Sequence, residues 1–86
     1  MINISNIISY LLNFNIEFSI HDSWVIDEGH YAYKDIILSI EDRNLQIVCR
    51  FFNNLEDIEY YIKNVEDCYK FYDIHEFHSY MLKIKA

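Results

Sequence analysis

A chain of 86 residues has room for one folded domain, and its formal charge of −7 excludes several classes of partner. Fourteen Asp and Glu outweigh seven Lys and Arg, which argues against direct nucleic-acid binding and against anionic membranes, and favours a basic protein partner. The hydrophobic fraction of 52% argues against disorder. The first residues, MINISNIISYLLNF, do not resemble a signal peptide, and no apolar run approaches the roughly 18 residues of a membrane span.

The first third of the chain predicts a helix followed by a strand. Helical spacing runs over residues 4–14, with Asn3 or Ser5 as the cap, and the apolar positions are Ile4, Ile7, Ile8, Leu11 and Leu12. Ile16, Phe18 and Ile20 then alternate with polar residues, which is typical of a half-buried strand. Residues 24–26 either extend this strand or form its far end. Residues 27–33 contain the single glycine and are predicted to form a loop.

Two further strands are predicted over residues 34–41 and 45–51, because apolar residues alternate in both segments. The four residues EDRN between them predict a tight hairpin connection. Asn44 is the residue best suited to a left-handed position in that connection.

The last third predicts helices. A three-four apolar spacing from Leu55 to Tyr72 predicts a helix from residue 53 to about residue 70, capped by Asn53 or Asn54. Glu59 with Lys63, and Glu66 with Lys70, would form pairs four apart that stabilise such a helix by about 0.2–0.5 kcal/mol each. Asp73 and Glu76 resemble a capping box for a last helix, whose buried stripe would be Ile74, Phe77, His78, Met81 and Leu82.

The predicted fold is therefore a single α+β domain over residues 1–86. An N-terminal helix, a three-stranded antiparallel sheet and one or two C-terminal helices would form two layers, because the helices must cover one face of the sheet.

The residues that most often carry catalysis or bind metals form no convincing site here. His75 and His78 lie three apart, but zinc needs three or four ligands, so no metal is expected. His21, Asp22 and Ser23 are adjacent only in sequence, and no glycine-rich loop is present to hold phosphate. Cys49 falls in a strand pattern and reads as a small core residue, without a disulfide. We therefore predict a protein that is not an enzyme and has no cofactor.

Clustered carboxylates are the sharpest feature of the sequence, and they allow two interpretations. Residues 53–76 contain seven acids against two lysines. They form either a solvated face over an aromatic core or a surface that a partner binds. The acids without an expected cation are Glu41, Asp42, Asp67, Asp73 and Glu76.

Three segments, NISNIISYLLN, IILSIEDRN and FYDIHEFHSYM, together with the length, the acidic charge and the predicted order of elements, resemble the small acidic anti-CRISPR proteins of Listeria prophages. Those proteins inhibit type II Cas nucleases by presenting carboxylates and amides to the basic pocket that reads the PAM. The resemblance implies a phage inhibitor in the bacterial cytoplasm that mimics DNA. Its partner would be a Cas nuclease with guide RNA.

The resemblance also implies a set of partner-binding residues. Glu41, Asp42 and Asn44 correspond to the acidic hairpin, and Asp73 and Glu76 to the acidic start of the last helix, preceded by the aromatic Phe71. Asn15 aligns with a family carboxylate, so it has lost the charge there. Arg43 stands where the family has a turn glycine, and Ile74 stands where it has an acid.

A second interpretation belongs to another class of protein. A toxin-neutralising or immunity-type protein that binds a basic enzyme would have the same composition. The genes that flank the coding sequence would separate the two classes.

Overall fold

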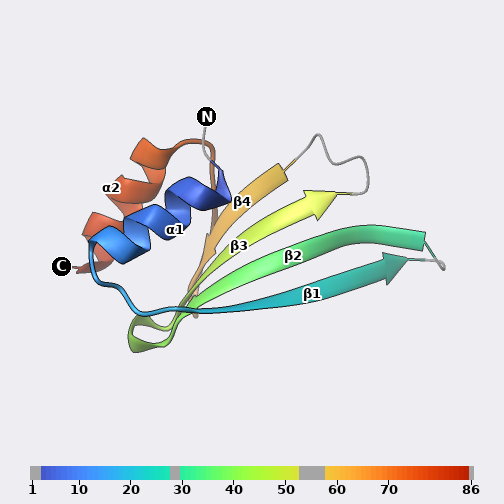
Figure 1. The fold of residues 1–86 in the computed structure, drawn as a ribbon, viewed down its shortest axis with the longest axis horizontal. Helices are drawn as coiled ribbons and strands as arrows, with labels where there is room; N and C mark the ends of the chain where they lie inside the picture. Colours follow the sequence, from blue (N-terminus) through green and yellow to red (C-terminus); the bar gives the residue numbers. More distant parts are fainter. Residues whose placement is uncertain (1–2, 28–29, 53–57, 86) are drawn as a thin grey trace.

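The structure is a computed structural model that describes residues 3–27, 30–52 and 58–85. Its elements are α1 (Ile4–Asn13), β1 (Ser19–Asp27), β2 (His30–Ile40), a 3₁₀ turn η1 (Glu41–Arg43), β3 (Leu45–Phe52), β4 (Ile58–Lys63), β5 (Cys68–Phe71) and α2 (Ile74–Lys85). The five strands form one sheet in the order β1-β2-β3-β4-β5, and every neighbouring pair is antiparallel. The two helices lie side by side against one face of this sheet (Figure 1). The predicted α+β class is confirmed.

The sheet has five strands, so the prediction of three strands is wrong, and so is the helix predicted up to residue 70. Residues 58–63 and 68–71 are strands, and α2 is the single described helix after the sheet. The caps predicted at Asn53 or Asn54 lie outside the described residues.

The strands β4 and β5 form because alternation prevails over the three-four spacing. Tyr60 and Ile62 point into the core while Glu59 and Lys63 do not, and aromatic and β-branched residues favour strands. Asn64 ends β4 and forms the turn to β5, because its side chain accepts hydrogen bonds from the backbone N–H of Glu66 at 2.8 Å and of Asp67 at 2.6 Å. The two helical ion pairs predicted from the spacing are therefore absent, and Glu59 binds Lys70 on the neighbouring strand at 2.7 Å.

Other predicted boundaries agree with the structure or shift by several residues. Asn3 caps α1 through a reciprocal pair of hydrogen bonds with Asn6, at 2.9 and 3.2 Å. The predicted loop over residues 27–33 is shorter than expected, because β2 already begins at His30. Residues 28–29 lie outside the described part.

The core lies between the helices and the strands β2 to β5. Its fully buried members come from both layers: Ile7, Leu11, Leu38, Ile40, Leu45, Ile47, Cys49, Ile62, Phe71, Phe77 and Met81. Cys49 is a core residue, as predicted, and its burial raises the pKa of the thiol to about 12. Leu12 and Leu82, expected in the helical stripes, are instead exposed.

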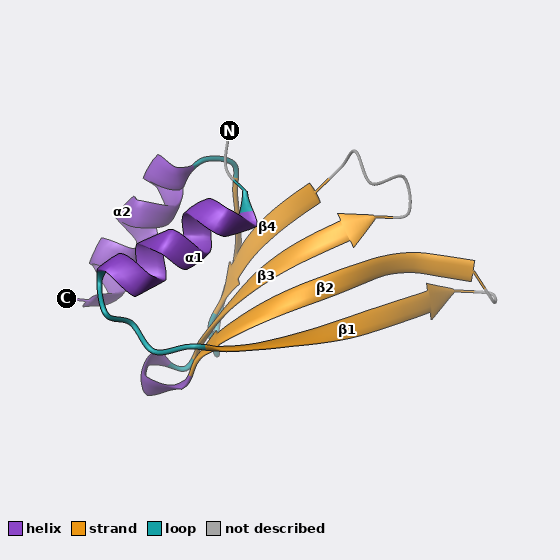
Figure 2. Ribbon diagram, viewed as in Figure 1, coloured by secondary structure: helices purple, strands orange, loops and turns teal. Residues whose placement is uncertain are grey.

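The helices cover only part of their face of the sheet. Figure 2 shows both helices near one end, while β1 and β2 extend well beyond them. No described β1 side chain belongs to the core cluster. Neither of the described α-helices lies on the opposite face of the sheet.

Candidate binding surface at the acidic end

The connection between β2 and β3 presents three of the predicted site residues. Glu41 and Asp42 lie in the turn η1 and are both exposed. Asn44 closes the turn in the left-handed conformation, with φ 50° and ψ 46°, and its N–H donates to the Glu41 carbonyl at 3.1 Å. The left-handed position predicted for Asn44 is confirmed, since asparagine tolerates this conformation better than other non-glycine residues.

The connection between α1 and β1 runs past this turn. Asn15 has a φ of 55°, and its N–H donates to the Leu12 carbonyl at 3.2 Å, so the chain leaves the helix sharply. Asn15 and Glu17 line one hollow together with Asp42 and Arg43. The structure thus brings Asn15 and Asp42, which the resemblance assigns to one set of partner-binding residues, to the same hollow.

A second carboxylate hollow adjoins the first. Glu17, Glu41 and Asp42 line it together with Ser19 and Ser39. We call the three exposed carboxylates Glu17, Glu41 and Asp42 the acidic end. Sequence reasoning missed Glu17, because nothing local distinguishes it from any polar position of a half-buried strand.

The acidic end is free of ion pairs within the described part of the chain. The salt bridges of the described residues lie elsewhere and join Lys34 to Asp22, Arg50 to Asp35, and Lys70 to Glu59. Arg43, the nearest cation along the chain, lies close enough to Tyr10 to lower the pKa of that phenol, although burial outweighs it and leaves the pKa raised.

Asp73 and Glu76 lie away from this turn, where α2 begins after the edge strand β5. In the strand register Phe71 pairs with Tyr60, which pairs with Cys49 of β3. Cys49 lies four residues along β3 from Leu45, where β3 begins after the turn η1, so the end of β5 is well separated from that turn. Figure 1 shows the start of α2 far from the β2–β3 connection. The predicted site residues therefore form two separate groups of acids.

The second group is engaged in the structure of α2. The Asp73 carboxylate accepts a hydrogen bond from the backbone N–H of Glu76 at 2.9 Å, as expected of an N-cap. Glu76 accepts a hydrogen bond from the Tyr69 hydroxyl at 3.4 Å, and this carboxylate raises the pKa of Tyr69. Capping accounts for Asp73, so we assign no partner to this group.

Phe71 is not available to a partner. Its side chain is 1% exposed and packs against Phe77, with ring centroids 5.3 Å apart. The burial of Phe71 corrects its assignment to a binding surface. The strand β5 explains the burial, because alternation turns Phe71 toward the helices and its neighbour Tyr72 outward.

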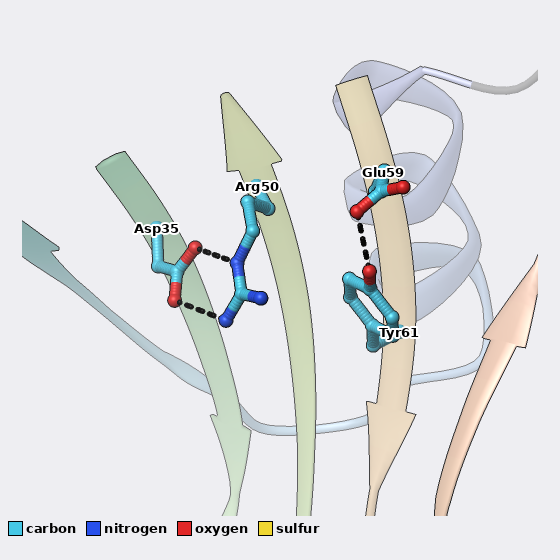
Figure 3. A network of polar contacts seen from close by, with 4 residues as sticks. All are labelled: Asp35, Arg50, Glu59 and Tyr61. Atoms are coloured by element: carbon cyan, nitrogen blue, oxygen red, sulfur yellow. Dashed lines mark hydrogen bonds and ion pairs between the residues drawn. The ribbon is translucent and has the colours of Figure 1, made fainter. Parts of the chain in front are cut away.

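The uncovered face of the sheet carries an ordered row of charges and aromatic rings (Figure 3). Asp35 on β2 accepts two hydrogen bonds from Arg50 on β3, at 2.9 and 3.1 Å. The guanidinium lies 4.1 Å from the ring centroid of Tyr33 and 5.3 Å from that of Tyr61. On β4, Glu59 accepts a hydrogen bond from Tyr61 at 2.5 Å and binds Lys70.

The contacts of Glu59 predict a pH dependence of stability. Lys70 and Tyr61 lower the pKa of Glu59 in the folded state, in that order of effect. A depressed carboxyl pKa adds stability above the unfolded-state value and loses it as the pH falls through the folded value. We expect Glu59→Gln to lower the free energy of unfolding near neutral pH. The difference from wild type should shrink on acidification below the ordinary glutamate pKa, measured by urea unfolding at several pH values.

An equal difference at every pH would contradict this prediction. Glu66→Gln is the matched control, because Glu66 is exposed and belongs to no ion pair of the described residues.

The described residues contain neither a metal-binding cluster nor a membrane-spanning helix. Within residues 3–27, 30–52 and 58–85, no three His, Cys, Asp or Glu side chains are placed to hold one metal ion. His78 lies with Nδ1 2.9 Å from the Tyr10 hydroxyl and so joins the two helices. None of the helices described is both long enough and apolar enough to cross a membrane.

Comparisons with protein-family models, with curated proteins and with solved structures gave no match. The element order predicted from the sequence, which contributed to the resemblance described above, also differs from the five-stranded order of the structure. The acidic end and the net charge are therefore the features that indicate a function.

Proposed function

We propose that this chain is a non-enzymatic binding protein whose acidic end occupies a basic site on a protein partner. The observation that carries the proposal is that Glu17, Glu41 and Asp42, from two connections far apart in sequence, line one hollow. All three are exposed, and none belongs to an ion pair of the described residues. Exposed carboxylates without cations project a negative field that speeds encounter with a basic partner.

A nucleic-acid-binding effector fits this field, and a type II Cas nuclease with its guide RNA is the partner we propose. Duplex DNA carries one charge per about 1.7 Å of its axis, so a DNA-binding groove is lined with arginine and lysine. Arginines that read guanine in a PAM make bidentate contacts, and a carboxylate is an equally suitable bidentate partner. The chain would block target DNA binding by occupying that groove inside the host bacterial cell.

The architecture supports presentation of the acids in a fixed geometry. Glu41 and Asp42 sit on a three-residue turn between two strands of the core, Ile40 and Leu45 being 1% and 2% exposed on either side. Glu17 follows a helix end fixed by the hydrogen bond from Ile16 N–H to the Leu11 carbonyl at 2.9 Å. Anchored connections of this kind cost little ordering entropy on binding.

The test is competition with DNA. Purified effector with guide RNA should bind less labelled PAM-containing duplex, and cleave it more slowly, as the protein is added. Loss of a bidentate, charge-assisted contact typically weakens binding by about 2–5 kcal/mol, so Asp42→Lys should weaken inhibition at least tenfold.

Glu76→Lys is the matched control. It makes the same change in net charge at the start of α2, away from the acidic end, and it should weaken inhibition by no more than a few-fold. Equal losses for the two variants would show that net charge alone matters and that the acidic end is not the binding surface. Absence of any effect on DNA binding or cleavage would contradict the proposed partner.

A further inference from the structure

The two edges of the sheet differ in how well they are protected. The edge strand β5 has four residues and carries Lys70, and short, charged edges resist pairing with another chain. The other edge strand, β1, has nine residues and contains no Lys, Arg or Pro. Among the described residues, backbone hydrogen bonds outside the helices and ladders involve none of residues 19–27. The outer edge of β1 therefore offers backbone donors and acceptors to a further strand.

Two exposed apolar side chains of β1 flank Asp22 on one face of this edge. Ile20 is 56% exposed and Trp24 is 58% exposed. Their partners in the register are Leu38 and Lys34 of β2, so both side chains lie on the face that carries the helices. Figure 2 shows that most of β1 extends beyond the helices.

We propose that β1 pairs antiparallel with β1 of a second copy, about a two-fold axis that passes beside Asp22, so that two five-stranded sheets join into one. A two-fold axis normal to the sheet places the helix-bearing faces of both copies on the same side. Side chains that meet across the new strand pair must therefore come from the same face of the sheet. In this register Ile20 lies opposite Trp24 of the second copy, and Trp24 lies opposite the second copy's Ile20. In this register each of these two exposed side chains gains an apolar neighbour from the second copy.

Charge is balanced in the same register. Asp22 meets Asp22 of the second copy, and each aspartate already has Lys34 of its own chain, with Nζ 3.7 Å from the carboxylate. Two carboxylates and two ammonium groups give a central cluster with no net charge. A one-position change of the axis, to His21 or Ser23, would place Asp22 opposite Ile20 or Trp24 and lose the apolar match.

Association of this kind has a characteristic response to salt. Pairing of one edge strand buries a small area, so the dimer is weak and forms at high protein concentration. Each copy carries a charge of −7, and the mutual repulsion falls as salt screens it. Salt should therefore strengthen self-association, whereas it should weaken binding of the acidic end to a basic partner. The two proposals can fail independently of each other.

The first experiment measures the mass of the intact chain by analytical ultracentrifugation, from low micromolar to submillimolar concentration and at two salt concentrations. We expect the mass to rise from one chain toward two, with the rise at lower concentration in higher salt. Ile20→Lys should weaken dimerisation at least tenfold, because lysine blocks an edge strand. Leu82→Lys, at a residue 52% exposed on α2, is the control and should leave it unchanged.

A wild-type chain that stays monomeric throughout would overturn the proposal, and so would equal effects of the two lysine variants. Circular dichroism of both variants checks that they are folded.

The second experiment tests the register by cross-linking in a Cys68→Ser chain, which lacks the exposed native cysteine. Residues directly opposite in an antiparallel pair have Cβ atoms about 4.5–5.5 Å apart, near the distance of a disulfide. Asp22→Cys should form a disulfide-linked dimer on mild oxidation. Ser19→Cys should not, because in this register position 19 of the second copy lies six strand positions away, roughly 20 Å. Equal cross-linking of both variants, or none of Asp22→Cys, would contradict the register.

Discussion

Phe71→Ala is expected to destabilise the protein by about 3–5 kcal/mol, which is the usual cost of removing a buried phenylalanine ring. Phe71 is 1% exposed and contacts Phe77 on α2 and Tyr60 on β4, with centroids 5.3 and 5.9 Å apart. A chain of this length has a free energy of unfolding of about 4–13 kcal/mol at 0.05–0.15 kcal/mol per residue. The variant should therefore lose a large share of its free energy of unfolding, as urea unfolding followed by circular dichroism would show.

The neighbouring residue provides the control. Tyr72 is 65% exposed, and Tyr72→Ala should cost less than about 1 kcal/mol, as most exposed substitutions do. The pair also separates a role in binding from a role in folding, since any loss of inhibition by Phe71→Ala would follow from unfolding. Similar stabilities of the two variants would mean that the side chain of Phe71 does not lie in the core.

The sequence predicts the first half of the fold well, because there a single periodicity fits each segment. Over residues 4–14 the spacing of three and four has no competing alternation, and the structure has a helix over Ile4–Asn13. The hairpin around Asn44 was predictable for a different reason: a left-handed residue must be found where glycine is missing, and asparagine is the natural candidate.

The second half was ambiguous. Ile58 and Ile62 are four apart, which fits a helix, but Ile58, Tyr60 and Ile62 also alternate, which fits a strand. Short segments of this kind are decided by what they can pair with, and β3 offers an edge that Ile58–Lys63 completes. Pairing partners are far apart in sequence, so local patterns do not reveal them.

The same limit affected the candidate site. Glu41, Asp42 and Asn44 could be placed together because they share one turn. Glu17 joins them only through the path of the chain after α1, and Asp73 separates from them only through the two strands that the sequence analysis did not find. Local chemistry is readable from sequence, while the assembly of distant residues into one surface depends on topology.

Asp35→Ala is expected to destabilise the protein by about 2–3 kcal/mol, although Asp35 lies on the sheet face that carries no helix. Removing one partner of a buried pair leaves the other charge uncompensated, at a cost of about 3–5 kcal/mol, and partial exposure of the Arg50 side chain, 29%, reduces it. Tyr33 and Tyr61 lie close to the guanidinium, so water has limited access to replace the lost carboxylate. Urea unfolding of the dilute protein measures the effect.

The pair Asp22 and Lys34 gives the exposed counterpart, because its atoms are 3.7 Å apart and the Asp22 side chain is 56% exposed. Asp22→Ala should therefore cost less than about 1 kcal/mol. In the double variant Asp35→Leu with Arg50→Met, both charges are gone, and apolar side chains of similar size restore most of the stability that either single change removes. A double variant as unstable as the sum of the two single ones would mean that Asp35 and Arg50 act independently. The uncovered face would then be held by its tyrosines rather than by the ion pair.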